Sequence, residues 1–459
     1  MRLAAALTVM LIVLLVAYAM LPRWQRESSD AALARAVSAY NLRPLATKPL
    51  METPKFVLGR ALFFDPILSG ARNISCATCH MLTAGSSDDL PRSIGAGGEG
   101  SGAERTARPD GSTMRRNALD LWNRDNNEAS AFFWDGRVDG VGSEGAAFRT
   151  PMGDALPSGI ENTMAAQALF PLVAADEMLG RSGDVSPSDL PSPHALQLND
   201  LAQAKAERAA NDGLAMAAVH GAILNRLLGN AGADSARWQE TYRQLFKAAY
   251  PDVSPETFSI VHVANAIAHY EELAFATRAT PWDRYLGGEL TALSDQQKRG
   301  ALIFLGKGRC AACHSGQLLS DFGYHSIGVP TDPAAEPDLG RFEVTGRPED
   351  RFKFRTPPLR NVALSGPYLH DGSATSLVDV VRQHLDPHRF AYGYNETGDH
   401  RMSSEEIMAI SPLLTSSPSV DGDDLRALVS FLDALTGDPS PKEDRILIPA
   451  TVPSGIPLN

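Results

Sequence analysis

Two five-residue segments of this 459-residue chain carry the residue types that bind haem covalently. Residues 76–80 read Cys-Ala-Thr-Cys-His and residues 310–314 read Cys-Ala-Ala-Cys-His, so both have the pattern C-x-x-C-H. In this pattern each thiol can form a thioether with one porphyrin vinyl group, and the histidine that follows can ligate the iron. The sequence therefore predicts two covalently bound c-type haems, with His80 and His314 as iron ligands. The four attachment residues are Cys76, Cys79, Cys310 and Cys313, which are all the cysteines of the chain.

Zinc sites and redox-active dithiols also use C-x-x-C pairs, and they remain the alternatives. The two pairs of a zinc site usually lie about 15–20 residues apart, whereas these pairs are more than two hundred residues apart. A redox-active dithiol would leave both histidines without a role. Haem attachment explains every residue of both motifs.

The residue opposite the histidine decides what each iron can do, because an iron with two strong axial ligands transfers electrons and an iron with one open face reacts with oxygen species. Residues 376–385 are predicted to form a short helix with one buried stripe at i, i+3, i+4 and i+7 spacing. The stripe consists of Leu377, Val380, Val381 and His384. We expect His384 to ligate the second iron opposite His314. The alternatives are His388, Met402, Met408 and an open second iron.

No second ligand is evident for the first iron. Between His80 and Tyr242 the chain has two further histidines, His194 in a proline-rich segment and His220 on a predicted helix, and it has no tyrosine in this interval. Methionines do occur there, so the open face is an inference. An iron that binds peroxide or oxygen requires such an open face.

The elements that must hold these motifs are mostly helical by their apolar periodicity. Strand signals are sparse, and Pro187, Pro191 and Pro193 mark a break in the chain. We therefore predict a mainly α fold with two cytochrome c-like haem domains and loop-rich insertions. The N-terminal haem domain is expected over residues 29–210 and the C-terminal haem domain over residues 211–459, with a C-terminal tail on the surface. Helices are predicted over residues 31–40, 50–68, 214–228, 235–248, 256–276, 294–305 and 376–385.

Residues 1–28 are predicted to be a signal peptide or an N-terminal membrane anchor. Arg2 precedes a charge-free, mostly apolar stretch over residues 3–21, and Ala17-Tyr18-Ala19 fits the small-x-small rule for cleavage. The stretch is also near the lower length limit for a bilayer span, and a core helix of a cytosolic protein is the third reading. A signal peptide or an anchor places the protein in the periplasm. It would be soluble there after cleavage of the signal peptide, or anchored to the inner membrane.

The overall composition restricts the classes of molecule that the protein can bind. With 44% hydrophobic and 21% charged residues the chain can bury a core, and its formal net charge is −12. The absence of a long basic run argues against nucleic acid as a partner. An acidic surface can steer a basic redox partner toward the protein.

Beyond the haem motifs, several segments in the same order resemble the bacterial diheme cytochrome c peroxidases and their MauG-type relatives. The resemblance extends from about Pro54 to Gly437, and the segments that carry it are 62–66, 133–137, 167–178, 281–286 and 367–372. It implies an N-terminal peroxidatic haem and a C-terminal electron-transfer haem.

The resemblance also implies roles for individual residues. Trp134 corresponds to the tryptophan between the two haems, Glu177 to the distal acid/base, Gln167 to its companion in the pocket, and Pro171 to a wall of that pocket. The residues that the resemblance assigns to a calcium ion between the domains are Asn117, Thr356 and Pro358.

Elementary chemistry agrees with these roles. A carboxylate in an otherwise apolar pocket can move a proton from the inner to the outer oxygen of peroxide, and such general acid–base catalysis contributes about 10²–10⁴-fold. An indole is oxidisable and bulky enough to bridge two porphyrins, although plain packing is the other reading of Trp134.

Two departures from the family pattern favour the MauG-like branch, which includes MbnH-type enzymes that oxidise a tryptophan on a partner protein. Residues 81–89 contain no histidine, whereas peroxidases that require reductive activation have one soon after the first motif, so we expect the first haem to be open without activation. His384 occupies the place of a methionine in ordinary peroxidases and a tyrosine in MauG, and a second histidine lowers the potential. Insertions at residues 138–161 and 179–211 could shape a docking surface.

We therefore predict a diheme peroxidase that reduces hydrogen peroxide at the N-terminal haem. Its electrons come from an external donor, a cytochrome c or a cupredoxin, through the C-terminal haem. The first alternative is peroxide-dependent oxidation of a side chain such as tryptophan on a partner protein. A non-catalytic electron-transfer cytochrome and a haem-based sensor are the further alternatives.

Overall fold

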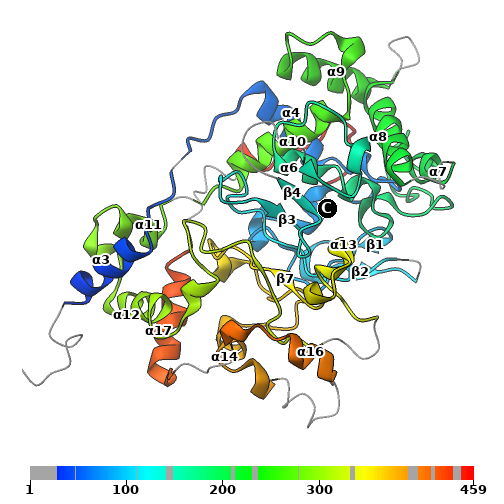
Figure 1. Cartoon of the computed structure of the whole chain (residues 1–459). Coiled ribbons are helices and arrows are strands. Elements are labelled where there is room, and N and C mark those ends of the chain that lie inside the picture. Colours follow the sequence, from blue (N-terminus) through cyan, green and yellow to red (C-terminus); the bar gives the residue numbers. More distant parts are fainter. Residues whose placement is uncertain are drawn as a thin grey trace, which may run out of the picture.

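The computed structural model describes most of the chain after residue 27 (Figure 1). The predicted signal peptide or anchor, residues 1–28, lies outside the described residues except for Ser28. No helix within the described ranges has both the length and the apolar character that a bilayer span requires. These ranges are 28–46, 48–109, 111–140, 148–207, 212–229, 236–277, 279–330, 336–390, 402–414, 419–437 and 446–458.

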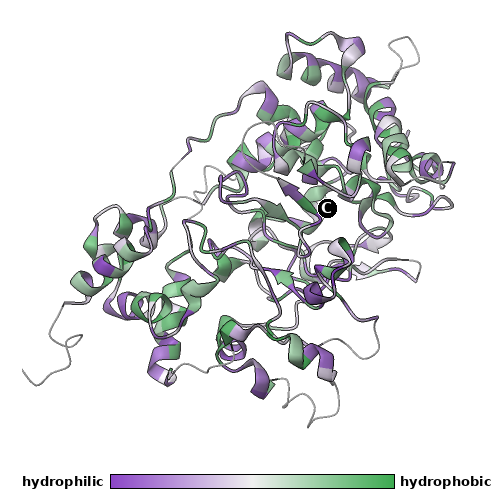
Figure 2. Ribbon diagram, viewed as in Figure 1, coloured by the Kyte–Doolittle hydropathy of each residue, from purple (hydrophilic) through white to green (hydrophobic). Residues whose placement is uncertain are grey.

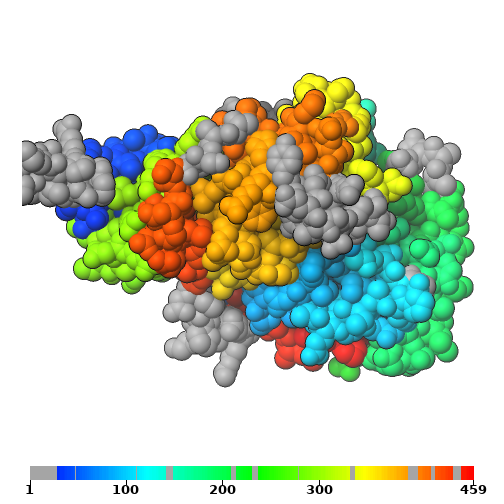
Figure 3. Space-filling view, turned by 90° about the horizontal axis from the view of Figure 1, so that it is seen from below, coloured from blue at the N-terminus to red at the C-terminus, as the bar shows by residue number. Residues whose placement is uncertain are grey.

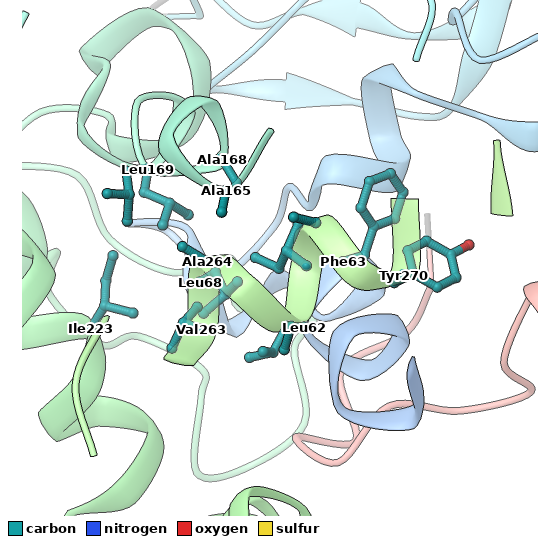
Figure 4. Close-up of a cluster of buried hydrophobic side chains, with 14 of the residues drawn as sticks. Leu62, Phe63, Leu68, Ala165, Ala168, Leu169, Ile223, Val263, Ala264 and Tyr270 are labelled. Carbon is teal, nitrogen blue, oxygen red and sulfur yellow. The ribbon is translucent and has the colours of Figure 1, made fainter. Parts of the chain in front are cut away.

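The described chain is mainly helical, which confirms the predicted fold class, and its apolar side chains form two large cores. Figure 2 shows hydrophobic helix faces turned inward and hydrophilic faces turned outward, and Figure 4 shows part of the first core between α4, α6, α8 and α10. The helices of the first core are α4 (Pro54–Phe64), α6 (Thr163–Ala168), α7 (Asp200–Ala206), α8 (Asp212–Leu228), α9 (Arg237–Ala249) and α10 (Ile260–Ala274). The helices of the second core are α3 (Ser29–Ala39), α11 (Pro281–Leu286), α12 (Asp295–Leu305), α14 (Leu377–Leu385) and α17 (Gly422–Asp433).

The helix before the first haem motif, α4, has a capped N-terminus, an end set by a proline, and a close crossing at one glycine. The side chain of Thr53 caps its first turn by accepting from the Phe56 N–H at 3.2 Å, and the helix ends before Pro66. At Gly59 the helix crosses α10 so closely that a Cβ there would lie 1.9 Å from the Ala266 carbonyl oxygen. Only glycine permits this approach.

The helix before the second haem motif, α12, repeats this arrangement. The Ser294 side chain caps it by accepting from the Gln297 N–H at 3.2 Å, as the predicted capping box requires. At Gly300 it crosses α17, and a Cβ there would lie 1.9 Å from the Ala427 carbonyl oxygen. Each haem motif therefore follows a helix that is docked on a partner helix through a glycine.

The first and last described segments each pack on the core that is remote from them in sequence. Helix α3 lies on the second core, where Leu33 is fully buried and Asp30 pairs with Lys298 at 2.7 Å. Residues 446–458 lie on the first core, where the Ser454 hydroxyl donates to the buried Asp65 carboxylate at 2.6 Å. The prediction of a surface tail is therefore wrong for residues 446–458, because their apolar side chains complete a core.

The predicted domain boundary at residue 210 does not coincide with the division between the cores. Helices α8, α9 and α10 belong to the first core, which continues to Phe275, and the second core resumes at Trp282. The proline-rich segment before residue 194 is part of an insertion on the first core, since His194 is buried and its Nε2 contacts the Ser454 carbonyl oxygen at 3.0 Å. Prolines mark a break in regular structure, and this break lies within a domain.

Short antiparallel strands and helices complete the fold. The hairpin of β3 and β4 carries the loop with Trp134, and in the second domain Tyr324 of β6 pairs with Arg355 of β7. The strands are β1 (Gly98–Glu99), β2 (Thr106–Ala107), β3 (Ala131–Phe132), β4 (Val138–Gly140), β5 (Phe148–Arg149), β6 (Tyr324–His325) and β7 (Phe354–Arg355). The remaining described α-helices are α5 (Cys76–Cys79), α13 (Phe342–Thr345) and α16 (Ser404–Ala409).

The two domains are in direct contact, as the adjoining cyan and yellow-to-orange surfaces of Figure 3 show. Arg116 of the first domain binds Asp338 of the second through two bonds of 2.7 Å, and it also pairs with Asp135 at 2.5 Å. Arg116 holds the pKa of Asp338 down at about 2, against the opposing effect of burial. This charged contact lies beside the loop that carries Trp134.

Candidate functional site

The first haem motif opens into a cavity of about 510 Å³ lined by Cys76, Cys79 and His80. A reciprocal cap starts the short helix α5, in which the Ser75 N–H donates to Thr78 Oγ1 at 3.0 Å. His80 Nδ1 lies 3.2 Å from the Ser86 carbonyl oxygen. Because a carbonyl oxygen only accepts, Nδ1 carries the proton and Nε2 keeps its lone pair free for a metal.

The second haem motif lines a smaller cavity of about 210 Å³. His314 Nδ1 lies 3.0 Å from the Leu319 carbonyl oxygen, so its Nε2 is also free to ligate. His384 lines the same cavity, and its Nδ1 lies 2.8 Å from the Val380 carbonyl oxygen one helical turn earlier. The ring centres of His314 and His384 are 6.4 Å apart, which suits one iron with a bond of about 2.0 Å to each ring.

The residues of both cavities fit two haems. All four cysteines are free thiols at the cavity walls. Burial lowers the pKa of His80 and His384, and burial with the neighbouring His384 lowers the pKa of His314 to about 4. These imidazoles are therefore neutral, as ligation requires.

Buried donors at the cavity walls fit the two carboxylates that a haem carries. Arg124 Nη1 and Arg355 Nη2 are buried and have no hydrogen-bond partner among the described residues, and both side chains line the first cavity. Buried guanidinium groups are costly without an acceptor, and carboxylates are their best acceptors.

A common wall separates the two cavities, and Trp134 is part of it. Its indole Nε1–H donates to the Asn117 carbonyl oxygen at 3.0 Å, and its ring meets the ring of His370 edge-on with centres 6.4 Å apart. The residues that line both cavities are Asn117, Ala118, Leu119, Asp120, Trp134 and Arg355.

The three residues predicted for the distal pocket all line the first cavity. Gln167 is on α6, Pro171 follows it, and Glu177 is on a short π-helical segment, Ala175–Leu179. Burial raises the pKa of Glu177, and Arg137, whose Nη2 lies 3.6 Å from Glu177 Oε1, opposes that rise. The structure thus brings an acid of raised pKa to the cavity that holds His80.

Among the alternative ligands of the first iron, the histidines lie outside its cavity, whereas methionines line it. His194 and His220 are buried outside the first cavity, so His80 is the only described histidine that lines it. Met114, Met178 and Met216 also line this cavity. In the second domain, His388, Met402 and Met408 do not line the cavity around His314.

Two of the three predicted calcium ligands already make hydrogen bonds in this structure, and the calcium site stays a prediction. The Asn117 side-chain amide donates to the carbonyl oxygens of Leu90 and Pro91 at 3.0 and 3.1 Å. The Thr356 carbonyl oxygen accepts from Ser320 Oγ at 2.7 Å and from Arg355 Nη1 at 3.1 Å. Both lone pairs of that oxygen are therefore engaged, and a guanidinium already supplies positive charge there. No hydrogen bond of Pro358 tests whether it could ligate calcium.

Glu271 is an acid of the first cavity that the sequence reasoning missed. It is 5% exposed on α10, lines the cavity, and burial raises its pKa to about 8. The signal was available, because Ala264, Ile267, Ala268 and Glu271 form an i, i+3, i+4, i+7 stripe in which the last member is an acid.

Comparisons with known proteins agree on one family. The family model described as "Di-haem cytochrome c peroxidase" matches residues 53–291. The methylamine utilization protein MauG of Methylorubrum extorquens is 30% identical over 388 residues, which are 84% of this chain and 79% of that protein. The cytochrome c551 peroxidase of Pseudomonas aeruginosa is 26% identical over 411 residues, 89% of this chain and 85% of that protein.

Solved structures show the same fold. A crystal structure of a MauG-like protein associated with microbial copper homeostasis matches with a TM-score of 0.56 and 25% identity, covering 90% of this chain and 95% of that one. The diheme peroxidase BthA from Burkholderia thailandensis matches with a TM-score of 0.54 and 22% identity, covering 86% and 94% of the two chains.

Proposed function

Since the chain belongs to the di-haem cytochrome c peroxidase family, we propose that hydrogen peroxide is reduced in its first cavity and that its second cavity passes electrons. One difference between the cavities supports this division. His80 is the only described histidine that lines the first cavity, whereas His314 faces His384 in the second. The bound haems supply the iron that exchanges electrons with peroxide and donor.

The proposed cofactors are two haems held by the thioethers of the four cysteines. His80 is the ligand of the first iron, and His314 with His384 are the ligands of the second. Their hydrogen bonds to backbone carbonyl oxygens fix the ring orientations and leave Nε2 for the metal.

Glu177 is the proposed acid/base. Reduction of hydrogen peroxide to two waters consumes two electrons and two protons, and one proton must move from the inner to the outer oxygen. A carboxyl of raised pKa can hold that proton and return it. Gln167 and Pro171, on the same cavity wall, orient the peroxide and exclude water from it.

Trp134 is the proposed electron relay. Its indole lies in the wall that both cavities share, and the bond from Nε1 to the Asn117 carbonyl oxygen holds the ring in place. An electron that enters at the second cavity can then reach the first through one oxidisable side chain.

A second candidate function is peroxide-dependent oxidation of a side chain on a partner protein. It is favoured by the 30% identity to MauG and by a histidine at a ligand position that is a methionine in ordinary peroxidases. The two functions use the same site and differ in the electron source, which is a small redox protein in the first and the partner itself in the second. Export to the periplasm by residues 1–28 is proposed for both, from the sequence.

Steady-state turnover and the ferric spectrum test the proposal. Purified holoenzyme is mixed with peroxide and with reduced cytochrome c or a reduced cupredoxin. Rapid peroxide-dependent oxidation of the donor supports the first function. Consumption of peroxide with near-zero donor oxidation supports the second. A ferric spectrum with only low-spin haem, together with no reaction with peroxide, would contradict both.

A further inference from the structure

The loop that carries Trp134 is bound by two arginines of the second domain through four consecutive carbonyl oxygens. The side chain of Arg355 donates from Nε to the Phe133 carbonyl oxygen at 3.0 Å, and its backbone N–H donates to the Trp134 carbonyl oxygen at 2.8 Å. Arg341 Nη1 donates to the carbonyl oxygens of Asp135 and Gly136 at 2.8 and 2.7 Å. Every carbonyl of residues 133–136 is therefore occupied by the second domain.

The loop needs this support because its own conformation is unfavourable. Phe133 has φ of +64°, a left-handed backbone that a bulky side chain rarely adopts. Gly136 has φ of +66°, and a Cβ there would lie 1.7 Å from Tyr324 Oη and 2.8 Å from Arg341 Nη1. Strained backbone persists only where the surroundings hold it, and such positions cluster at functional sites.

Both arginines are buried beside the loop. Arg341 is 5% exposed and Arg355 is 1% exposed, and no carboxylate of the described residues lies within ion-pairing distance of either guanidinium. The Arg341 guanidinium instead stacks over the ring of Tyr324 at 4.3 Å. Moving two guanidinium cations out of water to bind backbone oxygens carries a desolvation cost. This cost is accepted only where the position of the two side chains is important to the protein.

The two domains thus hold Trp134 from opposite ends. The first domain binds the indole Nε1–H through the Asn117 carbonyl oxygen, and the second domain binds the backbone on both sides of the residue. We propose that Arg341 and Arg355 are positioning residues that fix Trp134 between the two haem sites and thereby set the rate of electron transfer between them. This inference rests on the proposed role of Trp134 as a relay.

Arg341 is the better probe because it lines neither cavity. In the holoenzyme, Arg341→Met removes both bonds to the loop, and Arg341→Lys keeps the charge but replaces the planar guanidinium with a single ammonium nitrogen. The control is Arg347→Met, a nearby residue that is 63% exposed on its side chain and pairs with Asp350 at 3.1 Å. Inter-haem electron transfer is measured by pulse radiolysis, which needs no peroxide, and hydrogen–deuterium exchange is measured on a peptide covering residues 131–137.

We expect Arg341→Met to slow inter-haem transfer about tenfold or more, since small misplacements of a reacting group have effects of this size, and to raise exchange in residues 131–137. Arg341→Lys should recover part of the transfer rate and part of the protection from exchange. Arg347→Met should match the parent enzyme in both measurements. Inter-haem transfer at the parental rate in Arg341→Met would overturn the inference, whether or not exchange rises. A parent enzyme that does not react with peroxide would refute the proposed function, while the radiolysis and exchange results would still decide the role of Arg341.

Discussion

The two haem cavities are built alike on the side of the attachment motif and differently on the opposite side. In each, a helix docked through a glycine leads to C-x-x-C-H, and the histidine of the motif is oriented by a backbone carbonyl oxygen, that of Ser86 or Leu319. The other lining residues differ, because Glu177 and Gln167 line the first cavity, whereas His384 lines the second and faces His314.

This difference teaches that the attachment motif does not decide what a haem site does. In the proposed function, the motif binds the haem and supplies one iron ligand in both domains. The residues across each cavity then decide whether a second imidazole or a proton-transferring acid meets the iron. Four experiments would break or sharpen the comparison.

The largest effect is expected from Glu177→Gln, which keeps the shape of the side chain and removes the proton-transferring group. We expect the rate of the reaction with peroxide to fall about 10²–10⁴-fold. The raised pKa of Glu177 also places the acid limb of the parental pH–rate profile above the ordinary pKa of glutamate, and this limb should vanish in the variant. Stopped-flow mixing with peroxide across pH measures both.

The matched control is Glu240→Gln, which changes an exposed glutamate on α9 that pairs with Arg243 outside the cavity. It should react at the parental rate. An undiminished rate in Glu177→Gln would remove that residue from the acid/base role.

His384→Gly would make the second cavity resemble the first. If His384 ligates the second iron, its loss should convert one of the two haems from low spin to high spin, and free imidazole should restore the low-spin signal. Electron paramagnetic resonance of the ferric holoenzyme measures this. Met402→Leu is the control, since that buried methionine does not line the cavity. An unchanged spectrum in His384→Gly would mean that another residue ligates the iron.

Gly59→Ala and Gly300→Ala test the shared half of the comparison. In each, the new methyl group would meet a backbone oxygen 1.9 Å away in the partner helix, so the helices must separate. We expect each substitution to lower the free energy of unfolding by about 1–3 kcal/mol, measured by chemical denaturation of the holoenzyme. Gly183→Ala is the control, because a Cβ there would have no neighbour within 4 Å. If only one of the two substitutions lowered the free energy of unfolding, the two helix crossings would not be equivalent.

The effect of Glu271→Gln on stability should depend on pH. Burial raises the pKa of Glu271 from 4.5 to about 8, so between these values the folded chain keeps a proton that the unfolded chain releases. The stability of the parent should therefore fall as pH rises through this window, by at most about 1.4 kcal/mol per pH unit. Glu271→Gln should lack this contribution. Parallel stability–pH curves for the two proteins would show that Glu271 ionises normally.

Patterns that are local in sequence were predicted well. The helices predicted over residues 294–305 and 376–385 agree with α12 and α14 to within one residue, because each has a clear capping residue and an apolar stripe. The same stripe singled out His384, which the structure places across from His314. The distal ligand of the second iron remains a prediction, and so do the catalytic roles.

Long-range features were predicted poorly. A break in periodicity at the prolines near residue 190 carries no information on the side of it to which the next helices pack. The predicted boundary therefore separates α8, α9 and α10 from the first core, in which the structure places them. The tail at residues 446–458 lacks any regular pattern, although its apolar side chains fill a gap beside α4. The acidity of Glu271 depends on its burial, which the helix alone did not establish.

The sequence by itself determined the prediction of covalent haem attachment, because such attachment needs only two thiols and a histidine at fixed spacing along one segment. It also determined the helices that carry the motifs, since capping and apolar periodicity act between near neighbours. The tertiary structure alone decided how Trp134 is held. Its loop is strained, and the arginines that bind it are more than two hundred residues away in sequence, so only the packing of one domain against the other brings them together.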